Sequence, residues 1–224
     1  MLRKVTVISA VILGLVGCAS PKSFVDPSFP KVGYEELKKQ SSPLHLKLNV
    51  EFQRNGEHMP KVDKTLQTNA ETVLNKTGLV IPSADGGDGE IKVVVNNIAD
   101  LAKARALGFR TGLTFGLAGT TVTDAYEMSI TITAKGKTIS RSGIKHELHT
   151  AIGKTTLPAD LEIMTPNAAF EKVFEQMLLR ALQDMQKTGE LSLLGFPEVS
   201  IAYSPYIQRE LSVIALLSRN VSFD

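Results

Sequence analysis

Two histidines and a glutamate are the side chains that first suggest chemistry, because they stand together in the segment Lys145-His146-Glu147-Leu148-His149. Imidazole and carboxylate groups are common ligands of zinc and common general acids and bases. The spacing is not the His-Glu-x-x-His of a metalloprotease helix, and the surrounding pattern predicts a strand. Residues three apart on a strand point to opposite faces. His146 and His149 therefore could not reach one metal ion, and we predict no metal site for this pair.

Other partial motifs also fall short of a catalytic or cofactor site. Residues 153–155 read Gly-Lys-Thr, like the end of a phosphate-binding loop, but the glycine that the motif requires at position 148 is Leu148. A glycine-rich turn at residues 85–90 carries three carboxylates without the spacing of a calcium loop. The sequence also lacks a Gly-x-Ser-x-Gly nucleophile elbow. We predict a protein that is not an enzyme and has neither a cofactor nor a metal site. A hydrolase would need a fold that places one histidine beside a carboxylate from another strand.

The single cysteine closes an N-terminal segment with the layout of a secretion signal. Two basic residues precede an apolar run that is shorter than the ~20 residues needed to span a bilayer. The run ends in Leu15-Val16-Gly17-Cys18, which resembles the lipobox of bacterial lipoproteins. The resemblance implies that residues 1–17 are a signal peptide that is removed, and that the Cys18 thiol becomes a thioether to diacylglycerol.

The same resemblance implies a compartment. In that family the residue after the cysteine helps to sort lipoproteins between membranes, and Ala19, in place of aspartate, implies the outer membrane, with the protein facing the periplasm. The partner so implied is the membrane itself, reached through the lipid on Cys18. Because Cys18 is the only cysteine, a disulfide within the chain is impossible, and stability must come from an ordinary core.

The amino-acid composition limits the kinds of partner that this protein is expected to bind. Removal of the signal takes away two of the 25 Lys and Arg residues, which leaves 23 basic against 23 acidic side chains. A balanced charge gives no reason to expect nucleic acid as a partner. Tryptophan is absent, which weakens a carbohydrate-stacking interpretation. Residues 18–43 are rich in Ser, Pro and Lys, and we predict that they form a lipidated flexible tether.

Periodicity predicts one folded domain over residues 44–189. Strands are indicated at 44–52, 91–98 and 126–133, where apolar residues alternate or run together, and at 138–152, which would be the hairpin partner of 126–133. Helices are indicated at 62–77 and 170–185, where apolar residues recur at helical spacing. We predict an α+β fold, with a mostly antiparallel sheet and two helices packed on one face, in the order β-α-β-β-β-α.

This element order is similar to that of small envelope proteins, namely the lipopolysaccharide-assembly lipoprotein, auxiliary lipoproteins of ABC transporters and the amino-terminal domain of the Tol system's periplasmic protein. The likeness covers residues 44–189 and consists of element order alone. Two short sequence segments, 112–117 and 121–126, also resemble segments of small uncharacterised envelope lipoproteins. That resemblance implies a location in the envelope and no activity.

The segment 111–122 is uncharged and contains Gly112, Phe115, Gly116 and Gly119. It is too short to span a membrane as a helix, although it could do so as part of a β-hairpin. We expect a buried strand and turn that lead into the hairpin. The alternative is a loop that contacts a partner, a membrane or another copy of the chain.

Residues 190–224 form a C-terminal extension, with a possible short helix at 205–219. The sequence as a whole predicts an outer-membrane-anchored periplasmic lipoprotein that acts as a non-enzymatic binding or envelope-assembly module, through an envelope protein partner or self-association. The alternative function is an oligomeric structural or pore-forming subunit that uses the glycine-rich segment 111–122.

Overall fold

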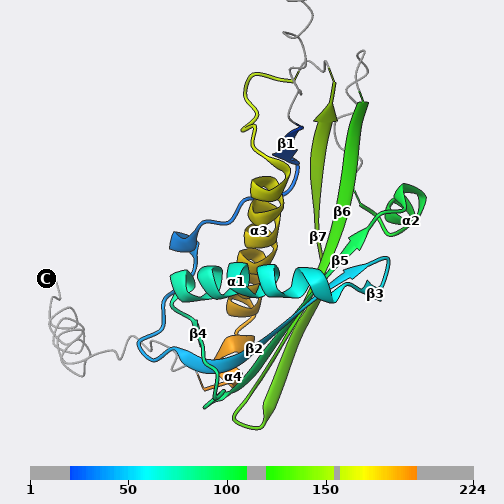
Figure 1. Ribbon diagram of the computed structural model, residues 1–224. Coiled ribbons are helices and arrows are strands. Elements are labelled where there is room, and N and C mark those ends of the chain that lie inside the picture. Colours follow the sequence, from blue (N-terminus) through cyan, green and yellow to red (C-terminus); the bar gives the residue numbers. More distant parts are fainter. Residues whose placement is uncertain (1–20, 110–119, 154–156, 196–224) are drawn as a thin grey trace, which may run out of the picture.

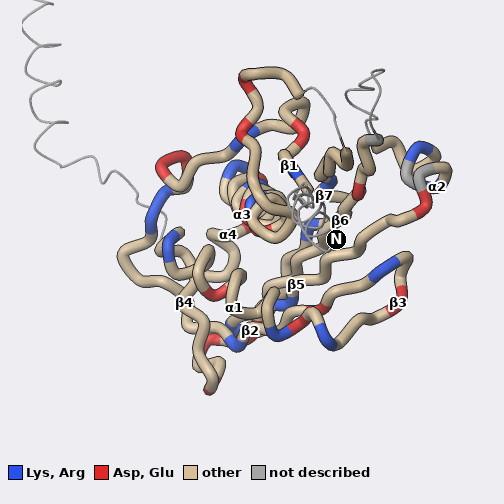
Figure 2. The backbone as a smooth tube through the Cα atoms, turned by 45° about the horizontal axis from the view of Figure 1, so that its top comes forward, with Lys and Arg blue, Asp and Glu red and all other residues tan. Residues whose placement is uncertain are grey.

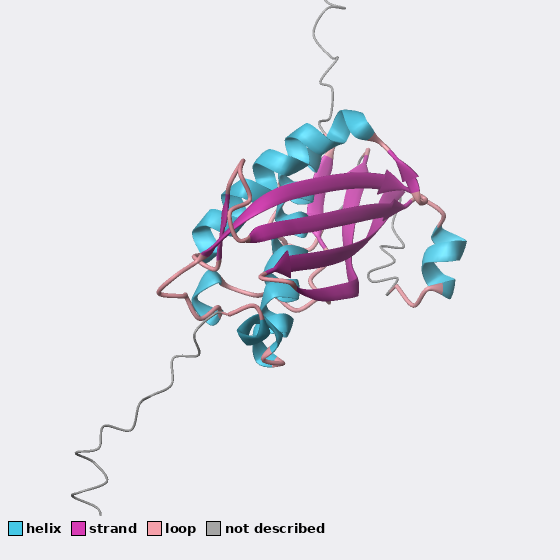
Figure 3. Ribbon diagram, turned by 90° about the horizontal axis from the view of Figure 1, so that it is seen from below, coloured by secondary structure: helices cyan, strands magenta, loops and turns pink. Residues whose placement is uncertain are grey.

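The computed structural model of the chain describes residues 21–109, 120–153 and 157–195. Its centre is a seven-stranded sheet in the order β1-β7-β6-β5-β2-β3, with β4 paired to β2 (Figure 1). The strands are β1 (Lys22–Val25), β2 (Leu44–Arg54), β3 (Glu57–His58), β4 (Val80–Pro82), β5 (Gly89–Ile98), β6 (Thr120–Ala134) and β7 (Lys137–Ile152). The sheet is strongly twisted (Figure 3), as right-handed strand twist requires.

The predicted α+β class is confirmed, with 32% helix and 38% strand in a mixed sheet. Four strand pairs are antiparallel, while β2 runs parallel to both β4 and β5. The parallel pairing follows from the helix that lies between β2 and β5 in the chain, because a crossover returns the chain to the end at which β2 began.

Two long helices cover one face of the sheet. Helix α1 (Pro60–Thr77) packs against β2, and α3 (Pro166–Lys187) packs against β7 and β1. Figure 1 shows the two helices crossing each other, with α1 lying across α3. Three shorter elements complete the described chain, namely α2 (Leu101–Ala106), α4 (Glu190–Leu193) and the 3-10 helix η1 (Tyr34–Glu36). The predicted order β-α-β-β-β-α corresponds to β2, α1, β5, β6, β7 and α3.

The core lies between this sheet face and the two helices. Alternate side chains of β2 point into it, with Leu46 fully buried, while His45 and Lys47 are exposed. Helix α3 contributes its predicted apolar stripe, including Phe174 and Leu182. Its first turn is capped by the Thr165 hydroxyl, which accepts a hydrogen bond from the Ala168 amide. None of the helices in the described part of the chain is both long and apolar enough to cross a membrane.

Two irregularities shape the long β6–β7 ribbon. Its turn is Lys135-Gly136, with φ of 51° and 76°, which matches a two-residue type I′ hairpin turn. Farther along, the register shifts between Met128 and Ile130, where β7 carries an extra residue and Gly143 adopts a φ of 71°. Such a bulge exchanges the two faces for the residues that follow it.

The predicted flexible tether is corrected for residues 22–43, which belong to the domain. The segment supplies β1 and buries Val32 and Leu37 in the main core. Its backbone is held by glutamines of α3. The Gln176 side chain accepts a hydrogen bond from the Val32 amide at 2.7 Å and donates one to the Val32 carbonyl at 3.2 Å. Gln186 makes the same pair of bonds to Lys38, each at 2.8 Å.

The tether interpretation rested on composition, and composition does not show that a helix distant in sequence satisfies the backbone of an extended segment. At the other end, the described fold continues past the predicted boundary at residue 189. Leu191 and Leu194 are buried, and Arg141 forms an ion pair with Glu190 at 2.8 Å. The described domain therefore covers residues 22–195. The predicted helix at 205–219 lies outside the described residues.

Substitution of one buried side chain tests whether residues 22–43 are part of the domain. Leu37→Ala should lower the free energy of unfolding by about 2–5 kcal/mol, because it leaves a cavity in a packed core. The neighbouring Lys38→Ala should change it by less than about 0.5 kcal/mol, because that side chain is exposed. Urea denaturation followed by circular dichroism measures both. Equal, small effects of the two changes would restore the tether interpretation.

Candidate functional site

The two histidines of β7 point to opposite faces of the sheet, as the strand pattern predicted. His146 lies on the helix-covered face, where its ring stacks on Phe29 with centroids 4.6 Å apart. His149 lies on the other face. Its ring centroid is 5.1 Å from that of Phe24, and its Nδ1 is 2.9 Å from the Thr123 hydroxyl. The pair does not form a shared metal site, and each histidine has its own surroundings.

His149 lies beside a carboxylate from another strand segment. Asp26 follows β1 directly, and its Oδ2 is 3.2 Å from His149 Nε2. The Asp26 and His149 side chains are 0% and 1% exposed. Asp26 is held in place by the pairing of β1 with β7, since its amide donates to the Glu147 carbonyl at 3.1 Å. Sequence reasoning missed Asp26 because it assigned that segment to the tether.

Glu147 completes a buried three-residue cluster. One ligand atom of each of Asp26, Glu147 and His149 lies within 4.8 Å of the other two. Glu147 is 1% exposed, and its Oε2 has no hydrogen-bond partner among the described residues. An unsatisfied buried polar group costs about 1–3 kcal/mol, and a charged one costs more. The Thr121 hydroxyl, on the same face of neighbouring β6, is likewise buried without a partner in the described part of the chain.

The electrostatics of the cluster show an excess of negative charge. Burial, and to a smaller extent the nearby Asp26 carboxylate, raise the pKa of Glu147 to about 7. Burial also acts to raise the pKa of Asp26, but hydrogen bonds from His149 and Ser28 outweigh it, so that this pKa lies below its ordinary value. Asp26 is therefore the ionised member, and Glu147 is the group that must be neutralised by a proton or a cation.

The arrangement of Asp26, His149 and Thr123 is carboxylate, imidazole and hydroxyl in sequence, as in a hydrolase triad. In a hydrolase, the bond that is cleaved must also be able to reach the nucleophilic hydroxyl. The imidazole and the carboxylate side chains are almost completely buried. A carboxylate does lie beside one histidine, which is the arrangement that the hydrolase interpretation requires.

A cavity of about 290 Å³ adjoins the cluster on the helix-covered side. His146, Phe29 and Asp26 line it from the sheet and from the segment after β1, and Lys172 and Gln176 line it from α3. The His146 Nδ1 accepts a hydrogen bond from the Glu147 amide at 2.9 Å. Burial lowers the pKa of His146 to about 4. The ring is therefore neutral at physiological pH and presents a mainly apolar wall to the cavity.

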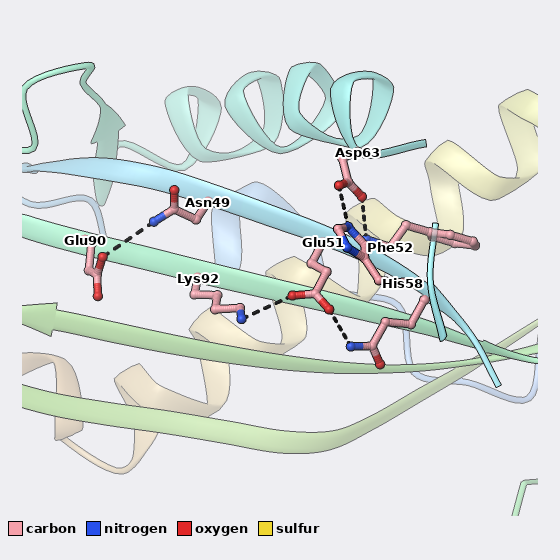
Figure 4. A network of polar contacts seen from close by, with 8 residues as sticks. Asn49, Glu51, Phe52, His58, Asp63, Glu90 and Lys92 are labelled. Atoms are coloured by element: carbon pink, nitrogen blue, oxygen red, sulfur yellow. Dashed lines mark hydrogen bonds and ion pairs between the residues drawn. The ribbon is translucent and has the colours of Figure 1, made fainter. Parts of the chain in front are cut away.

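The sheet face opposite the helices has a different character along β2 and β5. Lys92 forms an ion pair with Glu51 at 3.2 Å, and the Asn49 amide donates to Glu90 at 3.5 Å (Figure 4). Near the end of β2, the Asp63 carboxylate accepts a bond from the Phe52 amide at 2.8 Å. These groups are paired and solvated, and such surface pairs contribute little free energy. Along the described backbone, acidic and basic residues are interspersed (Figure 2).

The other residues that the sequence singled out have mixed outcomes. Cys18, Gly112, Phe115, Gly116 and Gly119 lie outside the described residues. The carboxylate turn at 85–90 has a structural role, because Asp88 Oδ2 accepts a hydrogen bond from the His45 amide at 2.8 Å. Only Gly153 of the Gly-Lys-Thr segment is described, with a φ of 81°.

Comparisons with known proteins do not assign a family. No family model matches the chain, and no curated protein sequence matches it significantly. Among solved structures, the chain is similar to one described as a neuraminyllactose-binding hemagglutinin homolog from Helicobacter pylori, with 9% identity, a TM-score of 0.28, and coverage of 82% of this chain and 96% of that one. An uncharacterized protein matches with 15% identity, a TM-score of 0.25, and coverage of 68% and 94% respectively. Likeness of this degree supports no functional inference.

The buried His146 should make stability depend on pH. The unfolded chain takes up a proton near the ordinary histidine pKa of 6.5, whereas folded His146 does so only near 4. Its contribution is therefore complete above pH 6.5 and is lost as pH falls towards 4, at up to about 1.4 kcal/mol per pH unit. His146→Asn, which keeps an acceptor near Nδ1 but does not titrate, should reduce this slope in urea unfolding between pH 4 and 7. The exposed His45→Asn is the control, and an unchanged slope in His146→Asn would contradict the assignment.

Proposed function

We propose that this protein is a lipoprotein anchored to the outer membrane through Cys18, with an α+β domain that faces the periplasm and binds another envelope component without catalysing a reaction. The observation that carries the proposal is the sequence Leu15-Val16-Gly17-Cys18 at the close of a basic and then apolar segment. Two or more acyl chains on one residue would hold the domain at the membrane far more firmly than a single chain.

The start of the described fold supports a domain held close to the membrane. β1 begins at Lys22, four residues after Cys18, and four extended residues span at most about 14 Å. β1 lies at the end of the sheet where β6 begins and β7 finishes, since Lys22 pairs with Ala151 (Figure 1). A lipid on Cys18 would keep this end of the sheet near the bilayer surface.

The described sheet edges are poor sites for adding a partner strand. On one side, Ser23 of β1 exchanges two backbone hydrogen bonds of 2.9 Å with Met164. On the other, the edge consists of β3 and β4, which have two and three residues. Short, covered edges resist pairing with another chain. The proposed partner would instead bind at the cavity beside His146, through the glycine-rich segment or through the C-terminal extension.

One observation favours the alternative of an oligomeric or pore-forming subunit. Residues 120–124 of β6 extend beyond the part that pairs with β5 and continue only with β7. Val122 on this extension and Ile152 at the end of the paired strand β7 are 42% and 52% exposed. The extension leads directly into the glycine-rich segment. A size measurement of the detergent-solubilised protein distinguishes the two functions, because a ring of many copies excludes a monomeric binding module.

Fractionation of the cell envelope tests the anchor. Wild type should sediment with the outer membrane, and Cys18→Ala should lose that location because it has no thiol to carry lipid. Ala19→Asp should move the lipidated protein to the inner membrane, if the sorting rule implied by the lipobox resemblance applies. Immunoblots of separated membranes measure all three, and crosslinked neighbours of the wild type identify the partner. Wild type and Cys18→Ala that are both soluble in the periplasm would refute the proposal.

A further inference from the structure

We propose that Asp26, Glu147 and His149 bind a divalent metal ion, with zinc as the ion that fits best. The three side chains come from the end of β1 and from β7, are at most 1% exposed, and bring one ligand atom each within 4.8 Å of the others. One imidazole nitrogen and two carboxylate oxygens form a donor set that zinc accepts readily. This inference is independent of the lipid anchor.

A second observation points to a ligand at this cluster. The Glu147 carboxylate is 99% buried, one of its oxygens belongs to the cluster, and its Oε2 has no hydrogen-bond partner among the described residues. Acidic side chains are almost never fully buried unless they are paired. Among the described residues, neither Asp26 nor Glu147 forms an ion pair with a Lys or Arg side chain, and one imidazole cannot balance two carboxylates. A cation between the three groups would ligate the Glu147 carboxylate and balance the charge.

The distances inside the cluster fit zinc. His149 Nε2 and Asp26 Oδ2 are 3.2 Å apart. Two ligands at the zinc distance of ~2.0–2.2 Å on a tetrahedral centre lie about 3.3–3.6 Å apart. The Glu147 oxygen lies within 4.8 Å of the other two ligand atoms, so a small shift of this side chain would bring it to the same ligand–ligand distance. Three protein ligands would leave a fourth position open, on the face that carries the unpartnered Thr121 hydroxyl.

Surrounding groups already orient the ligands. The Thr123 hydroxyl lies 2.9 Å from His149 Nδ1, so that Nε2 is turned to the cluster. The Ser28 amide donates to Asp26 Oδ1 at 2.7 Å, which leaves Oδ2 directed at His149. Such outer contacts are typical of metal-binding histidines and carboxylates. The ion would also join the segment after β1 to β7, and so fasten the first described strand to the body of the sheet.

Zinc binding to the stripped protein tests the proposal. Full-length mature protein in detergent is treated with a chelator, dialysed and titrated with zinc by calorimetry, with bound metal counted by elemental analysis. The expected result is one zinc ion per chain and a higher melting temperature. Cys18→Ala should bind equally well, which separates this site from the thiol. Less than 0.1 zinc per chain in folded wild type would overturn the proposal and leave a buried, protonated carboxyl only.

Variants assign the ligands. Glu147→Gln and His149→Gln should each weaken zinc binding by at least about 100-fold, more than loss of an outer contact does, whereas His45→Gln, at an exposed histidine, should not. Thr123→Val removes no ligand and should weaken binding by about 10–100-fold. Metal-free melting curves show that each variant is folded. Zinc binding by folded Glu147→Gln and His149→Gln at the wild-type affinity would overturn the assignment.

Discussion

The glutamines of α3 hold together the part of the molecule on which the candidate site depends. Gln176 and Gln186 each use a side-chain amide to satisfy both backbone groups of one residue in the N-terminal segment. An extended segment beside a helix has no ladder partner of its own, and buried backbone groups must be satisfied. These bonds hold Val32 and Lys38 against α3, and Gln176 also lines the cavity. The pairing of β1 with β7 then places Asp26 beside Glu147 and His149.

The bulge at Gly143 decides which side chains of β7 face the core. Before it, odd-numbered residues such as Ile139 point to the helices, and after it even-numbered residues such as Ile144 do so. Because strand side chains alternate, one extra residue reverses every later position. His146 therefore packs under the helices as a neutral ring, and His149 joins two carboxylates on the other face. A β7 strand without the bulge would exchange their surroundings.

Charged side chains on the sheet face opposite the helices are solvated at one end and buried at the other. Along β2 and β5, Glu51 and Lys92 form a solvated pair that needs no further partner. At the β1 end, Asp26 and Glu147 are buried with a single imidazole, and a low local dielectric makes an unbalanced charge expensive. This contrast is why the buried cluster, and not the exposed network, is the candidate for binding an ion.

Local periodicity was sufficient to predict the central elements of this protein. The stripe on α3, the alternation in β2, the hairpin turn at Lys135-Gly136 and the opposite directions of His146 and His149 all follow from side-chain spacing within one segment. The role of residues 22–43 and the presence of Asp26 in the site could not be predicted in that way. They depend on hydrogen bonds to α3 and on the pairing of β1 with β7, between residues more than 100 positions apart. Sequence patterns show which side chains of one segment are buried and which are exposed. The buried charge cluster, however, exists only because two segments distant in sequence pair at one edge of the sheet.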